Sequence, residues 1–192
     1  KDRKNIKVLE VGCGSCANLW MVATEGFDAH GIDLSHESLV LGQKMLDNWG
    51  VKANLKQGSF LDLPYESCSF DIVIDVFSMN CVNHDDFLMG LDEVYRVLKK
   101  DGLFFSYTPG KNSDAFKNYH PAKKIDNYTL DGIVRKDSPF SGNHYSFHFW
   151  DIETYYSALK DKGFTVDYIE TVQRSYYDRQ EVFEHIVSHS KK

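Results

Sequence analysis

Residues 10–18 read EVGCGSCAN, and this stretch decides the fold. The apolar run IKVLEV at residues 6–11 leads into its first glycine, and residues 17–25 have helical spacing before Gly26. An apolar run, a glycine-containing turn and an amphipathic segment in this order predict a strand that turns directly into a helix.

The same alternation continues along the chain. Residues 28–32 predict a second strand that ends at Asp33, and Ser35 is placed as the N-cap of a helix from about 36 to 49, which stops at Gly50. Further strands are predicted at 53–58, 70–76, 103–108, 164–172 and 181–188, and further helices at 85–100 and 151–162. The helix at 85–100 has a clear apolar face.

Alternating strands and helices predict an α/β fold with a seven-stranded, mostly parallel sheet and helices on both faces. The last two strands are too close in sequence for a helical crossover, so they are expected to form an antiparallel hairpin at one edge. The length of 192 residues predicts a single domain, 1–192. Within it, residues 110–146 form a long polar stretch, which predicts either a lid over the site or a surface insertion.

Composition excludes several classes of partner. The formal net charge is −6 and basic residues come only in pairs, so the footprint of a nucleic-acid-binding protein is missing. The sequence has no apolar stretch of the roughly 20 residues that cross a bilayer. We therefore expect a soluble, cytoplasmic protein with no nucleic-acid or membrane partner. The four cysteines lack zinc-site spacing and are expected to be reduced thiols.

Two chemistries compete for the first turn on local pattern alone. Cys13 and Cys16 form a CxxC pair at a helix start, where a thiol pKa is lowered, but a serial strand–helix array is not thioredoxin-like and Glu10 would oppose a thiolate. Gly12, Gly14 and Ala17 instead fit the GxGxxA turn of dinucleotide-binding proteins, with Asp33 about 20 residues on to bind a ribose.

Glu10 separates the dinucleotide interpretation from a third. A dinucleotide would place its pyrophosphate beside this carboxylate, and two anions in a partly desolvated turn repel each other. S-adenosylmethionine carries no phosphate and brings a sulfonium and an ammonium cation instead. The acidic residue before the glycine turn therefore favours S-adenosylmethionine.

Five stretches in order resemble the motifs of the class I S-adenosylmethionine-dependent methyltransferases. EVGCGSCAN is similar to the first motif, with Cys16 in place of its third glycine, and GIDLS at 31–35 is similar to the second-strand motif. The remaining three are GSFLDLP at 58–64, FDIVIDVFSMNCV at 70–82 and YRVLKKDGLFF at 95–105. The resemblance runs from about residue 6 to the C-terminus and implies a Rossmann-like sheet and methyl transfer to a small molecule.

The resemblance also implies which residues bind the donor. The acid Asp33 would accept both ribose hydroxyls, Phe60 would contact the adenine through its backbone amide, and Ser59 stands where an acid is usual. Asp75, at the end of the fourth strand, is expected to meet the methionine ammonium or to cap the next turn. The full set of expected cofactor-binding residues is Glu10, Gly12, Cys13, Gly14, Asp33, Leu34, Ser59, Phe60, Asp75 and Val76.

The acceptor is expected to be a small polar metabolite methylated on oxygen or nitrogen, with a sugar, a sugar nucleotide or an amine as candidates. If it presents a hydroxyl, a general base is useful, and the candidates are His144 and His148, with His144 the first choice and structural roles open for both. No metal site is expected, because the HxxxH spacing has no third ligand. The alternatives left open are an NAD(P)-dependent oxidoreductase and a non-catalytic S-adenosylmethionine-binding module.

Overall fold

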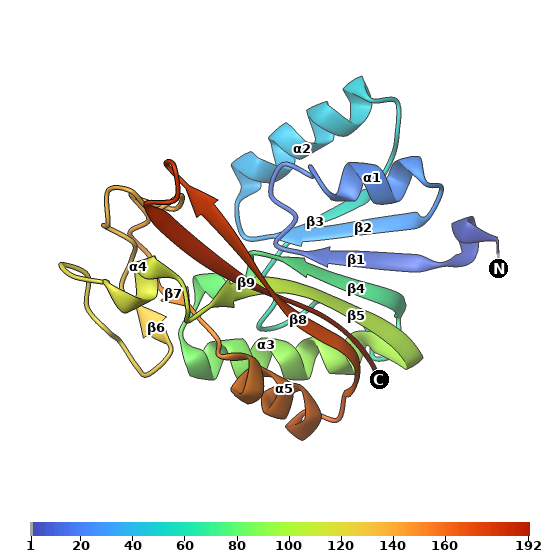
Figure 1. The fold of residues 1–192 in the computed structure, drawn as a ribbon. Helices are drawn as coiled ribbons and strands as arrows, with labels where there is room; N and C mark the ends of the chain where they lie inside the picture. The colour runs from blue at the N-terminus through green and yellow to red at the C-terminus, as the bar shows by residue number, and fades with distance from the viewer. Residues whose placement is uncertain (1) are drawn as a thin grey trace.

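The computed structural model describes residues 2–192, and its centre is a seven-stranded sheet with the strand order β3-β2-β1-β4-β5-β9-β8 (Figure 1). Strands β1 to β5 run parallel, and β9 pairs antiparallel with both β5 and β8. The strands are β1 Lys7–Val11, β2 Asp28–Asp33, β3 Asn54–Gln57, β4 Phe70–Val76, β5 Leu98–Gly110, β8 Thr165–Tyr176 and β9 Glu181–Lys191. The predicted Rossmann-like sheet with its antiparallel C-terminal hairpin is confirmed.

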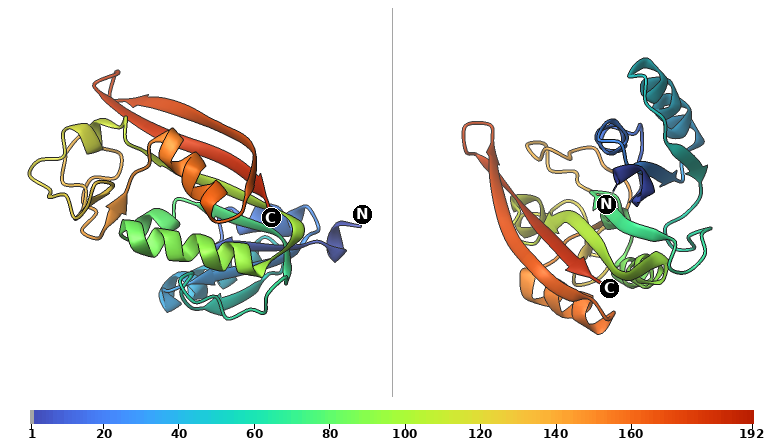
Figure 2. Two further views of the ribbon diagram at one scale, coloured as in Figure 1. Left: turned by 90° about the horizontal axis from the view of Figure 1, so that it is seen from below. Right: turned by 90° about the vertical axis from the view of Figure 1, so that its right-hand side faces the viewer.

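Helices cover both faces of this sheet (Figure 2). On one face lie α1 and α2, whose buried side chains form one apolar cluster, and on the other lie α3 and α5, which share a larger cluster. The helices are α1 Leu19–Thr24, α2 His36–Asn48, α3 His84–Val97, α4 Asp114–Lys117 and α5 Ile152–Asp161, with short 3-10 turns η1 Arg3–Asn5 and η2 Met79–Cys81. None of the helices within residues 2–192 has the length and apolar character needed to cross a membrane.

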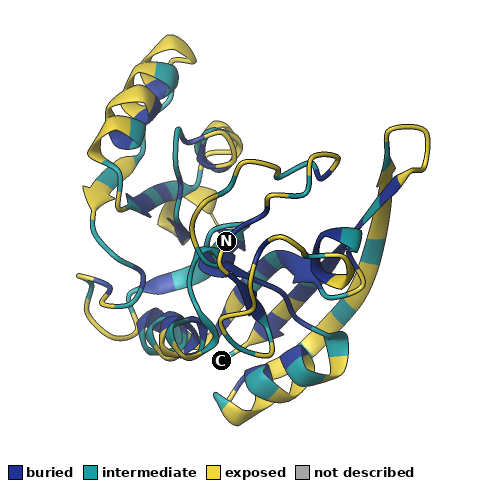
Figure 3. Ribbon diagram, turned by 90° about the vertical axis from the view of Figure 1, so that its left-hand side faces the viewer, coloured by how far each residue is buried: buried dark blue, intermediate teal, exposed yellow. Residues whose placement is uncertain are grey.

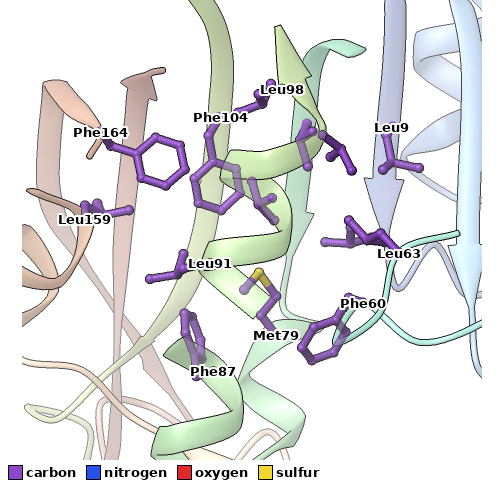
Figure 4. Close-up of a cluster of buried hydrophobic side chains, with 14 of the residues drawn as sticks. Leu9, Phe60, Leu63, Met79, Phe87, Leu91, Leu98, Phe104, Leu159 and Phe164 are labelled. Atoms are coloured by element: carbon purple, nitrogen blue, oxygen red, sulfur yellow. The ribbon is translucent and has the colours of Figure 1, made fainter. Parts of the chain in front are cut away.

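The larger cluster follows from the spacing of apolar residues on α3 (Figure 4). Phe87, Leu91 and Val94 recur three or four positions apart and are fully buried against Phe104 of β5. Burial of such side chains contributes roughly 2 kcal/mol each. Phe60, which follows β3, belongs to the same cluster, so the core reaches the edge of the sheet where the strands end.

The strand order reverses between β1 and β4. From β1 the chain runs outward to β2 and β3 on one side, then returns to β4 on the other side of β1, where Val11 pairs with Asp75. In open parallel sheets, ligands bind at the carboxyl ends of the strands that flank such a reversal. The fold therefore places the loops after β1, β2 and β4 around one crevice.

The segment 110–146 lies beyond these strand ends, where it carries α4 and β6, Thr129–Leu130 (Figure 1). β6 pairs with β7, Phe147–His148. Although the segment is polar in composition, it has an apolar cluster of its own, which Phe149 and Phe183 complete. A partly exposed ion pair between Arg135 and the buried Glu181 of β9 also joins it to the hairpin, with 2.7 Å between Nε and Oε2. It is thus a packed segment, referred to below as the cap segment.

Element boundaries differ from the sequence expectation mainly at α3 and β5. The helix ends at Val97 instead of residue 100, and β5 begins at Leu98 instead of 103, because Leu98 already pairs with Phe70 of β4. The first helix starts at Leu19, since residues 12–16 form the turn before it. The outer strand β8 is largely exposed, whereas β9 is buried beside it (Figure 3).

Candidate functional site

The turn after β1 is packed directly against the turn after β4. Gly12 and Gly14 both have positive φ, +64° and +50°, and a Cβ on Gly12 would lie 2.1 Å from the Cβ of Ser78. The Ser78 hydroxyl donates to the carbonyl of Val11 at 2.6 Å. Only glycine satisfies both the backbone angle and the close approach at position 12, so the two turns form one rigid edge of the crevice.

Both cysteines of this turn serve its packing. The thiols of Cys13 and Cys16 are buried and hydrogen-bond to each other, which raises the pKa of Cys13 and lowers that of Cys16. Each sulfur fills the space beside a glycine: a Cβ on Gly31 would lie 2.7 Å from the Cys13 sulfur, and one on Gly42 would lie 2.5 Å from the Cys16 sulfur. Cys16 holds a φ of +67°, the backbone angle that favours the third glycine of the expected motif. Its buried thiol occupies the groove beside α2.

Asp33, at the end of β2, closes the other side of the turn. Its carboxylate accepts the N–H of Gly14 at 2.8 Å and the N–H of Ser35 at 2.9 Å. Each oxygen therefore has one backbone partner and keeps a lone pair for a ligand. The next residue, Leu34, has 67% of its surface exposed and projects over the same crevice. An exposed leucine beside a fixed carboxylate suits a ligand with an apolar base and a hydroxylated sugar.

Glu10 lies within β1 behind the turn and is 2% exposed. Its Oε1 accepts a hydrogen bond from the Asn18 side chain at 2.9 Å, whereas its Oε2 is buried with no partner. Burial raises its pKa to about 7, with smaller contributions from the nearby carboxylates of Asp75 and Asp33. An unpartnered carboxylate oxygen in this position is suited to a cation and is costly without one.

A cavity of about 250 Å³ opens where these turns meet. Its lining residues come from the ends of β1 to β4: Gly12, Ile32, Asp33, Leu34, Gly58, Phe60, Phe77, Ser78 and Cys81. Asp33 is the one charged side chain among these lining residues of the described chain. The adjacent Ser59 is directed to its own loop, where its hydroxyl accepts the N–H of Leu61 at 3.1 Å. The cavity is therefore mildly acidic and otherwise apolar.

Asp75 and Val76 lie at the end of β4, outside the cavity lining. The Asp75 carboxylate is fully buried and accepts hydrogen bonds from Ser78, Met79 and Ser106, the first through both its N–H and its hydroxyl. Burial raises the pKa of this carboxyl. The geometry thus gives Asp75 the role of holding the turn that carries Ser78, the second of the two roles considered from sequence.

The structure does not bring His144 to the cavity. His144 is exposed, and it is its neighbour Tyr145 that interacts with the cavity residue Cys81. His148 is fully buried on the α3 side, where its Nε2 lies 3.0 Å from Nδ1 of His84. Burial and the neighbouring His84 lower the pKa of His148 to about 3. Neither histidine adjoins the donor end of the cavity.

Five lining residues of the cavity were not among the expected binding residues: Ile32, Gly58, Phe77, Ser78 and Cys81. Ile32 and Gly58 lie next to expected residues, and the other three follow the β4 strand within five positions, so their place at a carboxyl strand end was available as a signal. At this strand end, Asp75 and Val76 were expected to bind the cofactor, and the residues that follow them were not considered. Phe140 of the cap segment, which stacks on Phe77, had no comparable sequence signal.

The residues present fit S-adenosylmethionine. Gly12 leaves room where any side chain would meet Ser78, the buried Oε2 of Glu10 lacks a partner, and Asp33 offers two fixed carboxylate oxygens. In contrast, the cavity lining within residues 2–192 has no cationic side chain to balance a pyrophosphate. These residues match a positively charged nucleoside better than a dinucleotide.

Comparison with known proteins agrees with this site. A family model described as a methyltransferase domain matches residues 8–102, which include the glycine turn, Asp33 and β4. An uncharacterized protein of Methanocaldococcus jannaschii is 30% identical over 168 residues, 84% of this chain and 62% of that protein. A demethylmenaquinone methyltransferase of Staphylococcus aureus is 36% identical over 107 residues, 53% of this chain and 42% of the relative.

The chain thus spans less than two thirds of the length of these curated relatives. Among solved structures, an S-adenosylmethionine-dependent methyltransferase of Methanosarcina mazei has the same fold, with a TM-score of 0.80 at 20% identity over 97% of this chain and 92% of that one. The family match, the strand order and the acid-lined crevice agree: residues 8–102 match a methyltransferase domain, and the chain has the fold of an S-adenosylmethionine-dependent methyltransferase.

Proposed function

We propose that this protein transfers the methyl group of S-adenosylmethionine to an oxygen or nitrogen atom of a small-molecule acceptor. The observation that carries the proposal is the cavity at the strand reversal, whose only charged lining residue among those described is Asp33. Such a cavity favours a cationic nucleoside and disfavours a diphosphate, because an anion there would face a carboxylate with no compensating cation.

The site residues are proposed to divide the donor between them. Asp33 and Leu34 would hold the ribose and one side of the base, and Phe60 would cover the base from the core side. Gly12, Gly14 and Cys13 form the turn against which the methionine part would lie. The carboxylate of Glu10, held by the side chain of Asn18, would attract the ammonium group. Asp75 and Val76 are proposed to act indirectly, by fixing the turn after β4.

When bound, S-adenosylmethionine supplies an electrophilic methyl carbon on a positively charged sulfur. The work left to the protein is alignment and exclusion of water, which lower the barrier without a protein nucleophile. The packed contact between Gly12 and Ser78 fixes one side of the cavity, and the cap segment covers the side beyond Phe77. The geometry offers no histidine at the cavity, so His144 as a general base stays a prediction from sequence.

The acceptor is proposed to be a free small molecule. A net charge of −6 argues against a nucleic-acid chain. The curated relative named above methylates, by its name, demethylmenaquinone, which is also a small molecule. The sugar or sugar nucleotide expected from the polar composition of residues 110–146 remains a prediction.

Isothermal titration calorimetry tests the donor. S-adenosylhomocysteine is expected to bind, and NADH is not. Tight NADH binding without S-adenosylhomocysteine binding would replace the proposal with the oxidoreductase alternative. The transfer itself is tested by incubating the protein with S-adenosylmethionine and a metabolite extract, then searching by mass spectrometry for products heavier by one CH₂ unit. Donor binding with no such product would favour the non-catalytic binding module.

A further inference from the structure

Phe77 has an unusual backbone for a bulky residue. It follows β4 directly and holds a φ of +58°, a region that costs a residue with a Cβ roughly 1–2 kcal/mol. Its N–H donates to the carbonyl of Tyr107 at 3.0 Å, so pairing with β5 fixes this conformation. The result is that the ring of Phe77 forms part of the cavity wall, next to Ser78. Strain of this kind at a cavity points to a role in binding.

Aromatic rings surround Phe77 on the side away from the donor turn. Phe140 of the cap segment stacks on it nearly parallel, with ring centroids 5.0 Å apart and planes at 19°. Tyr107 lies 5.4 Å away and His185 lies 5.3 Å away, and these two rings stack on each other at 4.8 Å. Of these rings, Phe77 is the one among the cavity-lining residues of the described chain, and it is only half-buried, so part of its ring is open to a ligand while the others support it.

Polar groups are sparse at this end of the cavity. Cys81 lines it, and Tyr145 of the cap segment interacts with that thiol. No carboxylate or cation of residues 2–192 lines the cavity besides Asp33, which lies at the donor turn. A sugar would bury several hydroxyl groups here with few partners, at a cost of about 1–3 kcal/mol for each unpaired group. A flat ring would instead meet ring faces, with only one or two polar contacts.

We propose that Phe77, supported by the ring of Phe140 stacked on it, forms the binding surface for a planar aromatic acceptor that carries a hydroxyl or amino group. This inference rests on the proposed function. The acceptor oxygen or nitrogen forms a bond to the methyl carbon as the carbon–sulfur bond breaks. The bonding electron pair stays on sulfur, which leaves S-adenosylhomocysteine, and the acceptor proton passes to solvent. Contact with the ring of Phe77 orients the acceptor toward the donor.

A matched pair of ligands tests the preference for a flat ring. 2-Naphthol and its saturated counterpart decahydro-2-naphthol have the same hydroxyl and carbon skeleton, but only the first is planar and aromatic. Each is titrated by calorimetry into the protein saturated with S-adenosylhomocysteine. We expect 2-naphthol to bind at least about fivefold more tightly, as stacking on aromatic side chains predicts. Equal affinities, or no binding of either probe, would overturn the inference.

Two phenylalanine variants test the surface itself. Phe140→Leu keeps an apolar side chain and removes the stacking face, so the affinity for 2-naphthol should fall about fivefold while that for S-adenosylhomocysteine is unchanged. Phe116→Leu makes the same change in the same apolar cluster, and its ring contacts Phe149 instead of Phe77. It should keep the naphthol affinity. Equal losses in both variants would assign Phe140 to the packing of the cap segment alone.

These measurements separate the two proposals. S-adenosylhomocysteine binding together with no preference between the probes would remove the aromatic acceptor and leave methyl transfer standing. Absence of S-adenosylhomocysteine binding would remove the proposed function itself, before any acceptor is added.

Discussion

At the scale of single residues, the site depends on two acids in different environments. Asp33 is half-exposed at the cavity and has a backbone N–H on each oxygen, whereas Glu10 is buried with one oxygen unpartnered. Asp33 is placed to accept hydrogen bonds from hydroxyl groups of a ligand. Glu10 supplies a negative charge that becomes favourable only when a cation lies near it. Each role has a distinct experimental signature.

Asp33→Asn should weaken S-adenosylhomocysteine binding by about tenfold or more, because an amide can accept through only one of its two terminal atoms and carries no charge. Asp47→Asn is the matched control, since Asp47 is exposed on α2 and its carboxylate accepts a hydrogen bond from the side chain of Gln43 at the helix surface. Calorimetry on both variants gives the comparison. Unchanged affinity in Asp33→Asn would mean that the carboxylate serves only to join the turns at Gly14 and Ser35.

Glu10 makes stability depend on pH. Its pKa is raised to about 7 in the folded protein from an ordinary value of 4.5, so the folded state holds a proton that the unfolded chain releases between these values. The contribution of Glu10 to the unfolding free energy should therefore fall by an amount on the order of 3 kcal/mol as pH rises from 4.5 to 7. Buried His148, whose pKa is lowered to about 3, contributes in the opposite direction up to pH 6.5, so the effect of Glu10 is read as the difference between the urea titrations of the wild type and of Glu10→Gln.

Exposed Glu66→Gln serves as the control and should keep the full pH dependence. The same titrations with saturating S-adenosylhomocysteine should show the opposite trend in ligand affinity, which should rise as Glu10 ionises and attracts the ammonium group. The same pH dependence in Glu10→Gln and in the wild type would contradict the assigned pKa.

At the scale of elements, alanine substitutions at two glycines separate the effect of the contact between the β1 and β4 turns from the effect of backbone strain. Gly12 and Gly26 both have positive φ, but a Cβ on Gly12 meets Ser78 at 2.1 Å while one on Gly26 meets nothing within 4 Å. Gly26→Ala should cost about 1 kcal/mol of backbone strain. Gly12→Ala should cost about 3 kcal/mol, because overpacking adds to the strain, and should abolish donor binding. Chemical denaturation with calorimetry measures both, and equal costs would disprove the close contact.

The cap segment is joined to the hairpin by the ion pair between Arg135 and Glu181. Glu181 is fully buried and Arg135 is partly exposed, so Arg135→Met should destabilise the protein by about 2 kcal/mol, less than a fully buried pair costs. The double variant with Glu181→Gln should regain part of this loss, since no unpaired charge is left. Hydrogen exchange should show faster exchange in residues 129–148 of Arg135→Met. Unchanged exchange there would mean that the apolar cluster alone holds the segment.

How much of these elements the sequence predicts depends on how local their causes are. Strand β1, its glycine turn and α1 follow from apolar spacing and glycine positions within 20 residues, as does the N-cap of α2 at Ser35. The start of β5 at Leu98 depends on pairing with Phe70, 28 positions away in sequence, so local helical spacing extended α3 too far. Non-local pairing overrides local propensity at such boundaries.

The site also has a part that follows from local sequence and a part that does not. Asp33 and the glycines lie at predicted strand ends, and the structure brings them together around the cavity. The aromatic wall does not follow from any local pattern, because Phe77, Phe140 and His185 come from three distant parts of the chain. His144 and His148 were candidates on chemical type, but which residue of an irregular segment points inward is set by tertiary packing, and here Tyr145 is the one that interacts with Cys81.

At the scale of the whole molecule, the cap segment and the sheet are expected to unfold together. Phe149 and Phe183 join the apolar cluster of the cap segment to the hairpin, so little can open independently. Scanning calorimetry should give one transition with equal calorimetric and van't Hoff enthalpies. S-adenosylhomocysteine at 100 times its Kd should add about 2.7 kcal/mol and raise Tm by roughly 5–10 °C. Two separate transitions would contradict a single domain.

The packing of the cap segment on β9 and Phe77, away from β1 and β2, has an evolutionary consequence. The proposed donor-binding residues all lie in the first half of the sequence, whereas the cap segment that packs beyond Phe77 follows from the end of β5. Under the proposed function, substitutions between residues 110 and 146 should therefore change the preference for the acceptor and leave donor binding unchanged. Such a division lets a lineage acquire new substrates while its source of methyl groups stays the same.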